Sequence, residues 1–472
     1  MSSSAESPLA EALSRARWWL CIALLCMVVG GLRHNLVWGE DPERPWLLPL
    51  LNGLEAGSVV AFAAIGGLAW WRAWQRCARG GEVSLGQLLR MTVPILLVAV
   101  AVPLFLTTDP VDYVVRGRVM AVHGGNPYHN VALDYPGDPF LEFGDRGWKD
   151  MPLPYGPVVA NLQAGIAWLA HLLPVSPRVE LVVALVLFKL VFAAAMLLTG
   201  ALVWRIAAAL RPGAEPAVFV AVTWNPLLLD GCVANAHNDV LVLACLALAI
   251  VAAIGSRYAI ATVALTAGTL AKVVPALLGP VYFVRALRAR RLGSLALGVA
   301  VSLVAVAAFV LQFFAGEQGM GEVLARQNDL EGASLLWTVQ KLTGLPRDEL
   351  VRFGRLGVVA WVGWCSVRMW RRPEPRELVF ATASSLFALA LFGSALFGSW
   401  YHVWWLPFGL LLERGFLRRF AIAATFTAPL CYLAWAGLRR FDDLAQGWIA
   451  LCGVWLPLLL AALPRPRPTT GP

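Results

Sequence analysis

Thr107 to Pro157 read TTDPVDYVVRGRVMAVHGGNPYHNVALDYPGDPFLEFGDRGWKDMPLPYGP, the first long polar segment after a mostly apolar N-terminal region. Acidic and basic side chains crowd together here with turn-forming runs such as Gly124–Pro127 and Tyr155–Pro157. A loop of this length inside a compact protein is usually either functional or disordered. Its many tyrosine, phenylalanine and tryptophan side chains argue against disorder. The segment is therefore predicted to be an ordered functional loop.

The chain around this loop is apolar enough to need a lipid bilayer as its solvent. Of its 472 residues 59% are hydrophobic and 14% charged, and the mean hydropathy is +0.68. Its apolar runs are rich in Leu, Ala and Val and extend for about 20 residues, the length of a transmembrane helix. These features predict an all-α polytopic integral membrane protein, with residues 1–472 as one transmembrane domain.

Run length and the basic turns between runs predict a bundle of about fourteen helices. An alternative reading of the first as a cleaved signal peptide is disfavoured, because no small-x-small cleavage site follows Val29. The predicted spans are 18–38, 48–71, 88–107, 179–204, 216–229, 240–255, a two-helix hairpin over 258–284, 292–314, 353–370, 377–398, 400–412, 420–437 and 446–463.

Two segments leave a choice between crossing the membrane and turning back. Residues 158–173 are short for a span and contain polar side chains, so they are predicted to lie along the outer surface as an amphipathic juxtamembrane helix. Residues 258–284 could form one long span, but a hairpin keeps the arginines at both ends on the same side. The hairpin has Lys272 at its tip, toward the outer face.

The distribution of charge predicts which loops lie outside. The net charge of +9 is spread through short turns, which indicates membrane orientation rather than nucleic-acid binding. Residues 108–178 are predicted to be the first long outer loop with its juxtamembrane helix, and residues 315–351 the second outer segment. The eight cysteines form no Cys-x-x-Cys pair, so no thiolate metal site is predicted, and no cofactor is expected.

Asp109 and Asp112 are the first candidates for chemistry. A carboxylate at the membrane edge could take a proton from a hydroxyl group. The Asp-Pro pair is equally typical of a helix stop. Arg116 and Arg118, one turn further on, could bind a phosphate or form the charged face of a helix.

Three further candidates come from segments predicted to reach the same face. His237, Asn238 and Asp239 lie where an outer loop enters a span, a costly position for polar groups that favours function over an N-terminal cap. Lys272 could bind a lipid phosphate or extend its amine to the interface. Tyr401 and His402 lie together in the aromatic turn GSWYHVWW, where packing is the more common role of a histidine.

These segments resemble a known superfamily. DPVDYVVRGRVMAVHGGNPY (109–128) is similar to the D-x-Y-x-Y-x-x-D-G-R-V…G-x-NPY pattern of the polyprenol-phosphate-sugar-dependent glycosyltransferases of the GT-C superfamily. PLPYGPVV (152–159) and WNPLLLDGCVANAHNDVLVL (224–243) resemble the PYGPL and NPL…GAHND segments of their bacterial α-1,6-mannosyltransferase branch. The likeness covers residues 85–410. Arg116 departs from it, since an Asp usually precedes Gly-Arg-Val, and His123 adds one residue before the glycines.

The resemblance implies a GT-C-like bundle with an outer-face active-site loop in a multi-pass protein of the cell membrane. It implies an inverting transfer of a sugar, mannose by the closest branch, from a polyprenyl-phosphate donor to a glycan or glycolipid acceptor of the cell envelope. Asp109 would be the general base. The implied partners are the lipid donor, the acceptor and membrane lipid, without nucleic acid. Implied substrate-binding residues are Asp112, Arg116, Arg118, Asn126, Tyr128, Tyr155, His237, Asn238, Asp239, Lys272 and His402.

Two other classes compete with an enzyme. A transporter or flippase of lipid-linked sugars could use the same acids and bases along a path, but such proteins often contain repeats and paired broken helices, and the sequence has neither. A scaffolding membrane protein would leave the clustered outer acids unexplained. No glycine-rich phosphate-binding loop is present, which argues against a nucleotide-sugar donor.

Overall fold

The computed structural model describes residues 8–31, 47–104, 106–144, 148–314, 332–434 and 443–464. All of the regular elements in these ranges are helices, and their only β-type pairings are two isolated bridges, from Gly332 and from Ala333 to Leu396. The all-α class predicted from the sequence is confirmed. Residues 315–331 of the predicted second outer segment lie outside the described ranges.

The helices follow one another with short breaks. The α-helices are α1 (Pro8–Gly30), α3 (Leu47–Ala61), α4 (Gly67–Ala78), α5 (Leu85–Ala101), α6 (Asp109–Ala121), α7 (Pro157–His171), α8 (Pro177–Leu210), α9 (Glu215–Thr223), α10 (Pro226–Leu229), α11 (Asp239–Ile254), α12 (Tyr258–Ala271), α13 (Gly279–Arg288), α14 (Leu292–Phe313), α16 (Leu335–Thr343), α17 (Arg347–Arg371), α18 (Pro375–Ala388), α19 (Leu406–Leu411), α20 (Phe416–Thr427), α22 (Asp443–Ala450) and α23 (Leu456–Ala462). Short 3-10 or π segments are η1 (Phe62–Gly66), η2 (Ala132–Asp134), η3 (Pro139–Glu142), η4 (Asp230–Ala234), η5 (Val274–Leu278), η6 (Leu389–Gly393), η7 (Ser399–Trp404), η8 (Ala428–Tyr432) and η9 (Leu451–Trp455).

Seven helices in the described ranges are long and apolar enough to cross a membrane, and an eighth span results if α9 and the 226–234 segment, bent by 48°, are counted as one. The predicted number of about fourteen is not confirmed. The difference arises partly because α5, α11 and α12 are apolar but shorter than a full span. Apolar runs in the sequence do not reveal where a helix stops early. The seven are Pro8–Val29, Asn52–Ala78, Pro177–Leu210, Leu292–Phe313, Arg347–Arg371, Pro375–Gly393 and Asp443–Ala462.

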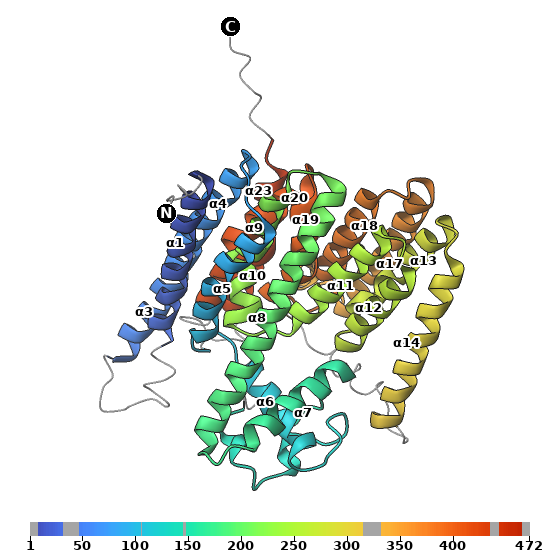
Figure 1. Ribbon diagram of the computed structural model, residues 1–472. Coiled ribbons are helices and arrows are strands. Elements are labelled where there is room, and N and C mark those ends of the chain that lie inside the picture. The colour runs from blue at the N-terminus through green and yellow to red at the C-terminus, as the bar shows by residue number, and fades with distance from the viewer. Residues whose placement is uncertain are drawn as a thin grey trace, which may run out of the picture.

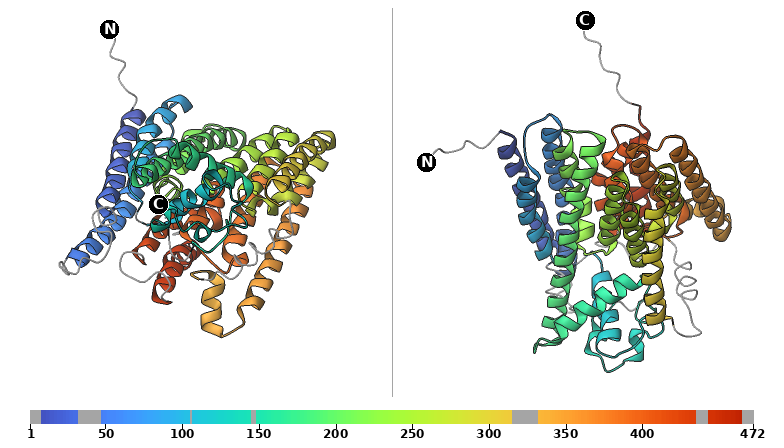
Figure 2. Two further views of the ribbon diagram at one scale, coloured as in Figure 1. Left: turned by 90° about the horizontal axis from the view of Figure 1, so that it is seen from below. Right: turned by 45° about the vertical axis from the view of Figure 1, so that its right-hand side comes forward.

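The helices form one bundle with a cap at one end. α6, α7 and the first turns of α8 make up the cap, below the bundle in Figure 1 and in the right-hand view of Figure 2, and the loops between α6 and α7 fold against it. α1 begins and α23 ends at the opposite end of the bundle (Figure 1). The chain therefore enters the cap from α5 and leaves it along α8, whose 34 residues span cap and bundle.

The cap is held together by a buried charge cluster around Arg118. Its guanidinium pairs with Asp138 at 3.1 Å and with Glu180 at the start of α8, and lies 4.0 Å over the ring of Phe140. Burial favours the neutral acid, but the N–H of Phe140, His123 and Arg118 together outweigh it and lower the pKa of Asp138. This cluster fixes the loop to the helices on both sides of it.

Close contact between α6 and α7 depends on a glycine. A Cβ added to Gly117 would lie 2.4 Å from the backbone oxygen of Gln163, so only glycine allows this crossing. The segment 158–173, predicted as a helix outside the bundle, is accordingly a cap helix packed on α6. The Gly-Arg-Val run at 117–119 thus has a structural role. Gly117 allows α6 to cross α7 closely, and Arg118 forms the centre of the ion cluster.

The 258–284 segment is the predicted hairpin. α12 ends at Lys272, and Pro275 in η5 begins the return, since proline cannot continue the helix. Tyr258, at the start of α12, donates a hydrogen bond to the carbonyl of Arg285 near the end of α13 (3.4 Å). The two ends therefore lie side by side, with Lys272 at the opposite tip.

Candidate active site

The breaks between helices bring distant segments together where the cap meets the bundle. Asp109 is the first residue of α6, and Tyr155 precedes α7. His237 precedes α11, and Lys272 ends α12. Contacts described below connect these side chains to one another and to the aromatic segment η7. Four of the segments singled out in the sequence thus form one site.

Asp109 and His237 form the centre of this site. His237 Nδ1 lies 3.4 Å from Asp109 Oδ2, with the imidazole buried and the carboxylate 19% exposed. The other face of the histidine stacks on Trp400 at 4.5 Å between ring centroids and 15° between planes. His237 Nε2 is buried and has no hydrogen-bond partner among the described residues. The contact places His237 Nδ1 beside the carboxylate, and Nε2 can still form a hydrogen bond.

The backbone before His237 is bent sharply. Asn225 caps α10 by accepting hydrogen bonds from the N–H groups of Leu227 and Leu228, and the chain then widens into the π segment η4. Ala236 adopts φ +51°, a left-handed conformation that costs a residue with a Cβ about 1–2 kcal/mol. Strain of this kind is often found at functional sites. Here the bend directly precedes His237, whose N–H donates to the carbonyl of Gly231 at 2.9 Å.

Lys272 lies in a cage of one carboxylate and three rings. Its ammonium donates to Asp239 at 2.7 Å and lies 5.1–5.7 Å from the ring centroids of Tyr155, Tyr401 and Trp404. Trp404 Nε1 donates to the same carboxylate oxygen. Cation–π contacts stabilise the ammonium without using its N–H donors. An ammonium has three donors, so Lys272 retains donors for an anionic ligand.

Tyr155 connects the two halves of the site. Gly156 N donates to the carbonyl of Ala271 at 3.0 Å, and a Cβ on Gly156 would lie 2.1 Å from the carbonyl oxygen of Leu270. The glycine therefore docks this loop against the end of α12. Burial, followed by repulsion from Asp109, raises the pKa of Tyr155 well above its usual value, which keeps the phenol neutral.

Asp112 and Arg116 lie close to the site but are buried. The carboxylate of Asp112 packs near Gly144 of the loop, and Arg116 donates to the carbonyl of Trp148 at 3.3 Å. The positive charge of Arg116 is close enough to lower the pKa of Tyr155 in part, so the guanidinium lies near the site. Both remain predicted substrate-binding residues, with Asp109 the more accessible carboxylate.

Four other predicted residues have structural partners in this structure. Asn126 donates to the carbonyl of Phe313 at the end of α14 (2.6 Å), and Tyr128 Oη donates to the carbonyl of Tyr155 (2.8 Å). Arg118 belongs to the ion cluster of the cap. His402 contacts the carbonyl of Gly453 at 2.9 Å in an aromatic core, the packing role weighed above. Of these contacts only that of Tyr128 reaches a residue of the site, the backbone of Tyr155. The binding roles of all four residues stay predictions. Asn238 lies beside His237, with Nδ2 buried and without a partner in the described ranges.

Sequence reasoning missed several aromatic members of the site. Trp400 contacts His237 and Trp404 contacts Lys272, and neither was singled out. Tyr401, which the sequence singled out together with His402, also contacts Lys272. Tyr113, buried on α6, meets Tyr155 edge-on at 5.5 Å. The density of rings in GSWYHVWW was the available signal. The described residues contain no group of three His, Cys, Asp or Glu arranged to hold a metal ion.

One comparison with known proteins identifies the family. The model described as alpha-(1->6)-mannopyranosyltransferase, N-terminal domain, matches residues 17–289, more than half of the chain and all of the site except η7. The chain belongs to this mannosyltransferase family. It is accordingly a glycosyltransferase, and its apolar helices make it a membrane protein. No curated protein matches the chain.

Proposed function

We propose that this mannosyltransferase transfers mannose, with inversion, from a polyprenyl-phosphate donor to a hydroxyl group of a glycan or glycolipid at the outer face of the cell membrane. The observation that carries the proposal is the contact between Asp109 and His237 beside the caged ammonium of Lys272. Asp109 and Lys272 supply a base and a cation at one end of an apolar bundle. A lipid-linked donor can enter there from the membrane.

Asp109 takes the role of general base. Its carboxylate accepts the proton of the acceptor hydroxyl while the acceptor oxygen forms a bond to the anomeric carbon. The bond from that carbon to the phosphate oxygen breaks, and its electron pair stays on the phosphate. His237 Nδ1, 3.4 Å from the carboxylate, orients it toward the acceptor. Attack from the face opposite the leaving phosphate inverts the configuration.

The leaving polyprenyl phosphate requires a positive partner. Lys272 supplies an ammonium whose position is fixed by Asp239. Charge stabilisation by a pre-positioned donor is the largest single contribution in many enzymes. Asp239 is not the base, because Lys272 and Trp404 both donate to its Oδ1 in a buried position.

Product formation tests the proposal. Purified full-length protein is incubated with a glycan acceptor and with polyprenyl-phosphate mannose, glucose or arabinose, and glycoside products are measured by mass spectrometry. The expected result is a mannoside formed from the mannose donor. Movement of the lipid-linked sugar across vesicles without any glycoside would support the transporter alternative and overturn the proposal. The Asp109→Asn variant is the matched control.

A further inference from the structure

A groove of about 890 Å³ lies on the side of the bundle, away from the Asp109 site. It runs between α17 and α18 and continues to the chain that joins α19 to α20. Its wall is mainly aromatic and aliphatic, and Phe353 and Phe392 are 68% and 42% exposed, so the groove opens outward. The apolar lining includes Phe353, Trp361, Phe380, Phe387, Phe392 and Phe416.

The groove is long and narrow. On α17 its lining extends from Phe353 to Arg368, which at 1.5 Å per residue corresponds to about 22 Å. The hydrocarbon core of a bilayer is about 30 Å thick, so one leaflet contributes about 15 Å. The groove is longer than that, and one acyl chain of a leaflet can therefore lie along it.

One end of the groove is positively charged. Four arginines and two glutamates line it there, which leaves a net charge of +2. Two of the arginines are paired with the glutamates, Arg368 with Glu377 and Arg376 with Glu413. Arg211 and Arg414 form no ion pair within the described residues. An anionic headgroup next to the acyl chain would meet these two.

This basic end is far from the reacting groups. Phe188 of α8 meets the ring of Tyr113 at 5.7 Å between centroids, at the level of the Asp109 site, and Arg211 follows Phe188 by 23 residues, or about 34 Å of helix. A phosphate at Arg211 is therefore not the phosphate of a donor positioned for transfer at Asp109.

We propose that the groove binds an anionic phospholipid, with its phosphate on Arg211 and Arg414 and one acyl chain along the apolar wall. The site goes beyond the proposed transferase function and does not depend on it. Phosphate recognition follows from the two arginines without an ion pair, and chain recognition follows from the length and aromatic lining of the groove.

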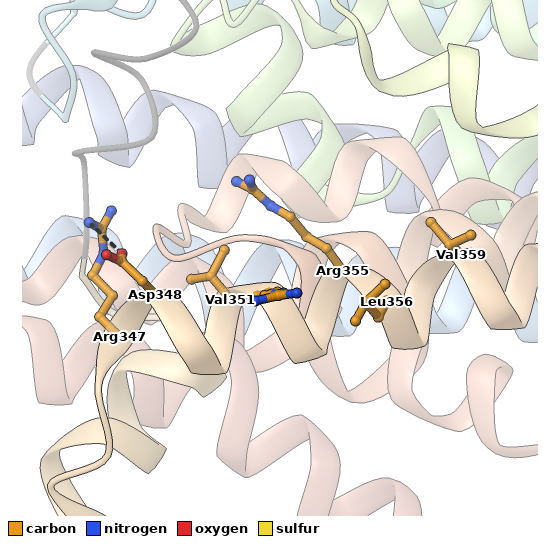
Figure 3. A pocket seen from close by; sticks show the side chains of 7 residues that line it. Arg347, Asp348, Val351, Arg355, Leu356 and Val359 are labelled. Atoms are coloured by element: carbon orange, nitrogen blue, oxygen red, sulfur yellow. Dashed lines mark ion pairs between the residues drawn. The ribbon is translucent and has the colours of Figure 1, made fainter.

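A second hollow on α17 does not carry the same inference. It measures about 390 Å³ and is formed by side chains of this one helix near its first turns (Figure 3). Arg347 there pairs with Asp348 at 3.8 Å, and Arg355 donates to the carbonyl of Gly393 at 3.3 Å. Two of the three arginines that line it are thus engaged, and no second element provides a wall for a chain.

Two glycines of α17 offer a matched pair of variants. A Cβ on Gly357 or on Gly363 would meet no atom within 4 Å, but only Gly357 lines the groove. Gly357→Leu should fill the groove, and Gly363→Leu should leave it open. Removal of the two basic side chains, in Arg211→Gln/Arg414→Gln, tests the headgroup separately.

The experiment measures lipid binding to the detergent-purified full chain by native mass spectrometry, with phosphatidylglycerol and phosphatidylcholine of the same acyl chains as probes. We expect phosphatidylglycerol to bind at least tenfold more tightly. Gly357→Leu should lose this binding, Gly363→Leu should keep it, and the double arginine variant should bind both lipids equally. Circular dichroism checks that each variant is folded.

Three outcomes would overturn the proposal. They are equal binding of the two lipids to the wild-type protein, unchanged binding to Gly357→Leu, and displacement of phosphatidylglycerol by an equimolar amount of a polyprenyl phosphate. The last outcome would assign the groove to the tail of the donor. Transferase activity is not part of the readout, so failure here leaves the proposed function standing.

Discussion

Replacing Lys272 by methionine removes the cation proposed to hold the donor phosphate, but it also breaks a buried ion pair. Lys272 Nζ lies 2.7 Å from Asp239, whose side chain is only 2% exposed. Leaving a buried charge without its partner typically costs 3–5 kcal/mol. Because the lysine side chain is 19% exposed, we expect Lys272→Met to destabilise the protein by about 3 kcal/mol, at the lower end of this range. Activity loss in this variant alone would be ambiguous.

The double variant Lys272→Met/Asp239→Asn separates stability from donor binding. It removes both charges, and the amide oxygen can still accept the hydrogen bond from Trp404. Most of the lost stability should return. Donor binding should not, since charge-assisted hydrogen bonds contribute about 1.5–3 kcal/mol, equivalent to a roughly ten- to hundredfold rise in the KM for donor.

Thermal unfolding in detergent and steady-state kinetics with the lipid-linked sugar measure the two effects. Asp239→Asn is the control, because it breaks the same pair but keeps the ammonium, and it should raise the KM for donor less than the double variant does. A double variant with wild-type stability and a wild-type KM would refute the reasoning, and Lys272 would then have a structural role.

Three more predictions follow from the cap and its orientation. Gly156→Ala forces the loop away from the end of α12 and should lower kcat at least tenfold while the protein stays folded, as measured by kinetics and circular dichroism. Arg118→Met leaves two buried carboxylates without their cation and should destabilise the protein by about 3–5 kcal/mol, which a lower unfolding temperature would reveal. Cysteines placed at Gly137 and at Gly293 in a cysteine-free background should differ in labelling by an impermeant reagent, the first reacting from outside; equal labelling would contradict the orientation.

Local signals in the sequence predicted where helices break, but they did not predict how long each helix is. The hairpin tip at Lys272 followed from arginines at both ends of a short apolar segment, and the structure has the break there. The number of spans could not be obtained in this way. α9 stops at Thr223 and the chain bends within an apolar run, and hydropathy does not record such a bend.

Contacts between helices were beyond the sequence for a different reason. Asp109 and His237 were each singled out, but nothing in the pattern of either segment predicts that they meet. Arg118 was predicted either to bind a phosphate or to form the charged face of a helix, and the sequence did not indicate that it pairs with Asp138 and Glu180. Which cation is neutralised and which stays available is decided by packing, and a single sequence contains no direct signal of packing.

Single-turnover kinetics of Asp109→Asn test the central claim most directly. The substitution preserves the size of the side chain, so donor KM and unfolding temperature should stay near those of the wild-type protein. The rate of the chemical step should fall by about 10²–10⁴, the usual contribution of a positioned base. Asp112→Asn, a buried neighbour one turn away, should reduce the rate of that step much less. A near wild-type rate for Asp109→Asn would contradict the account, as would a larger loss in Asp112→Asn.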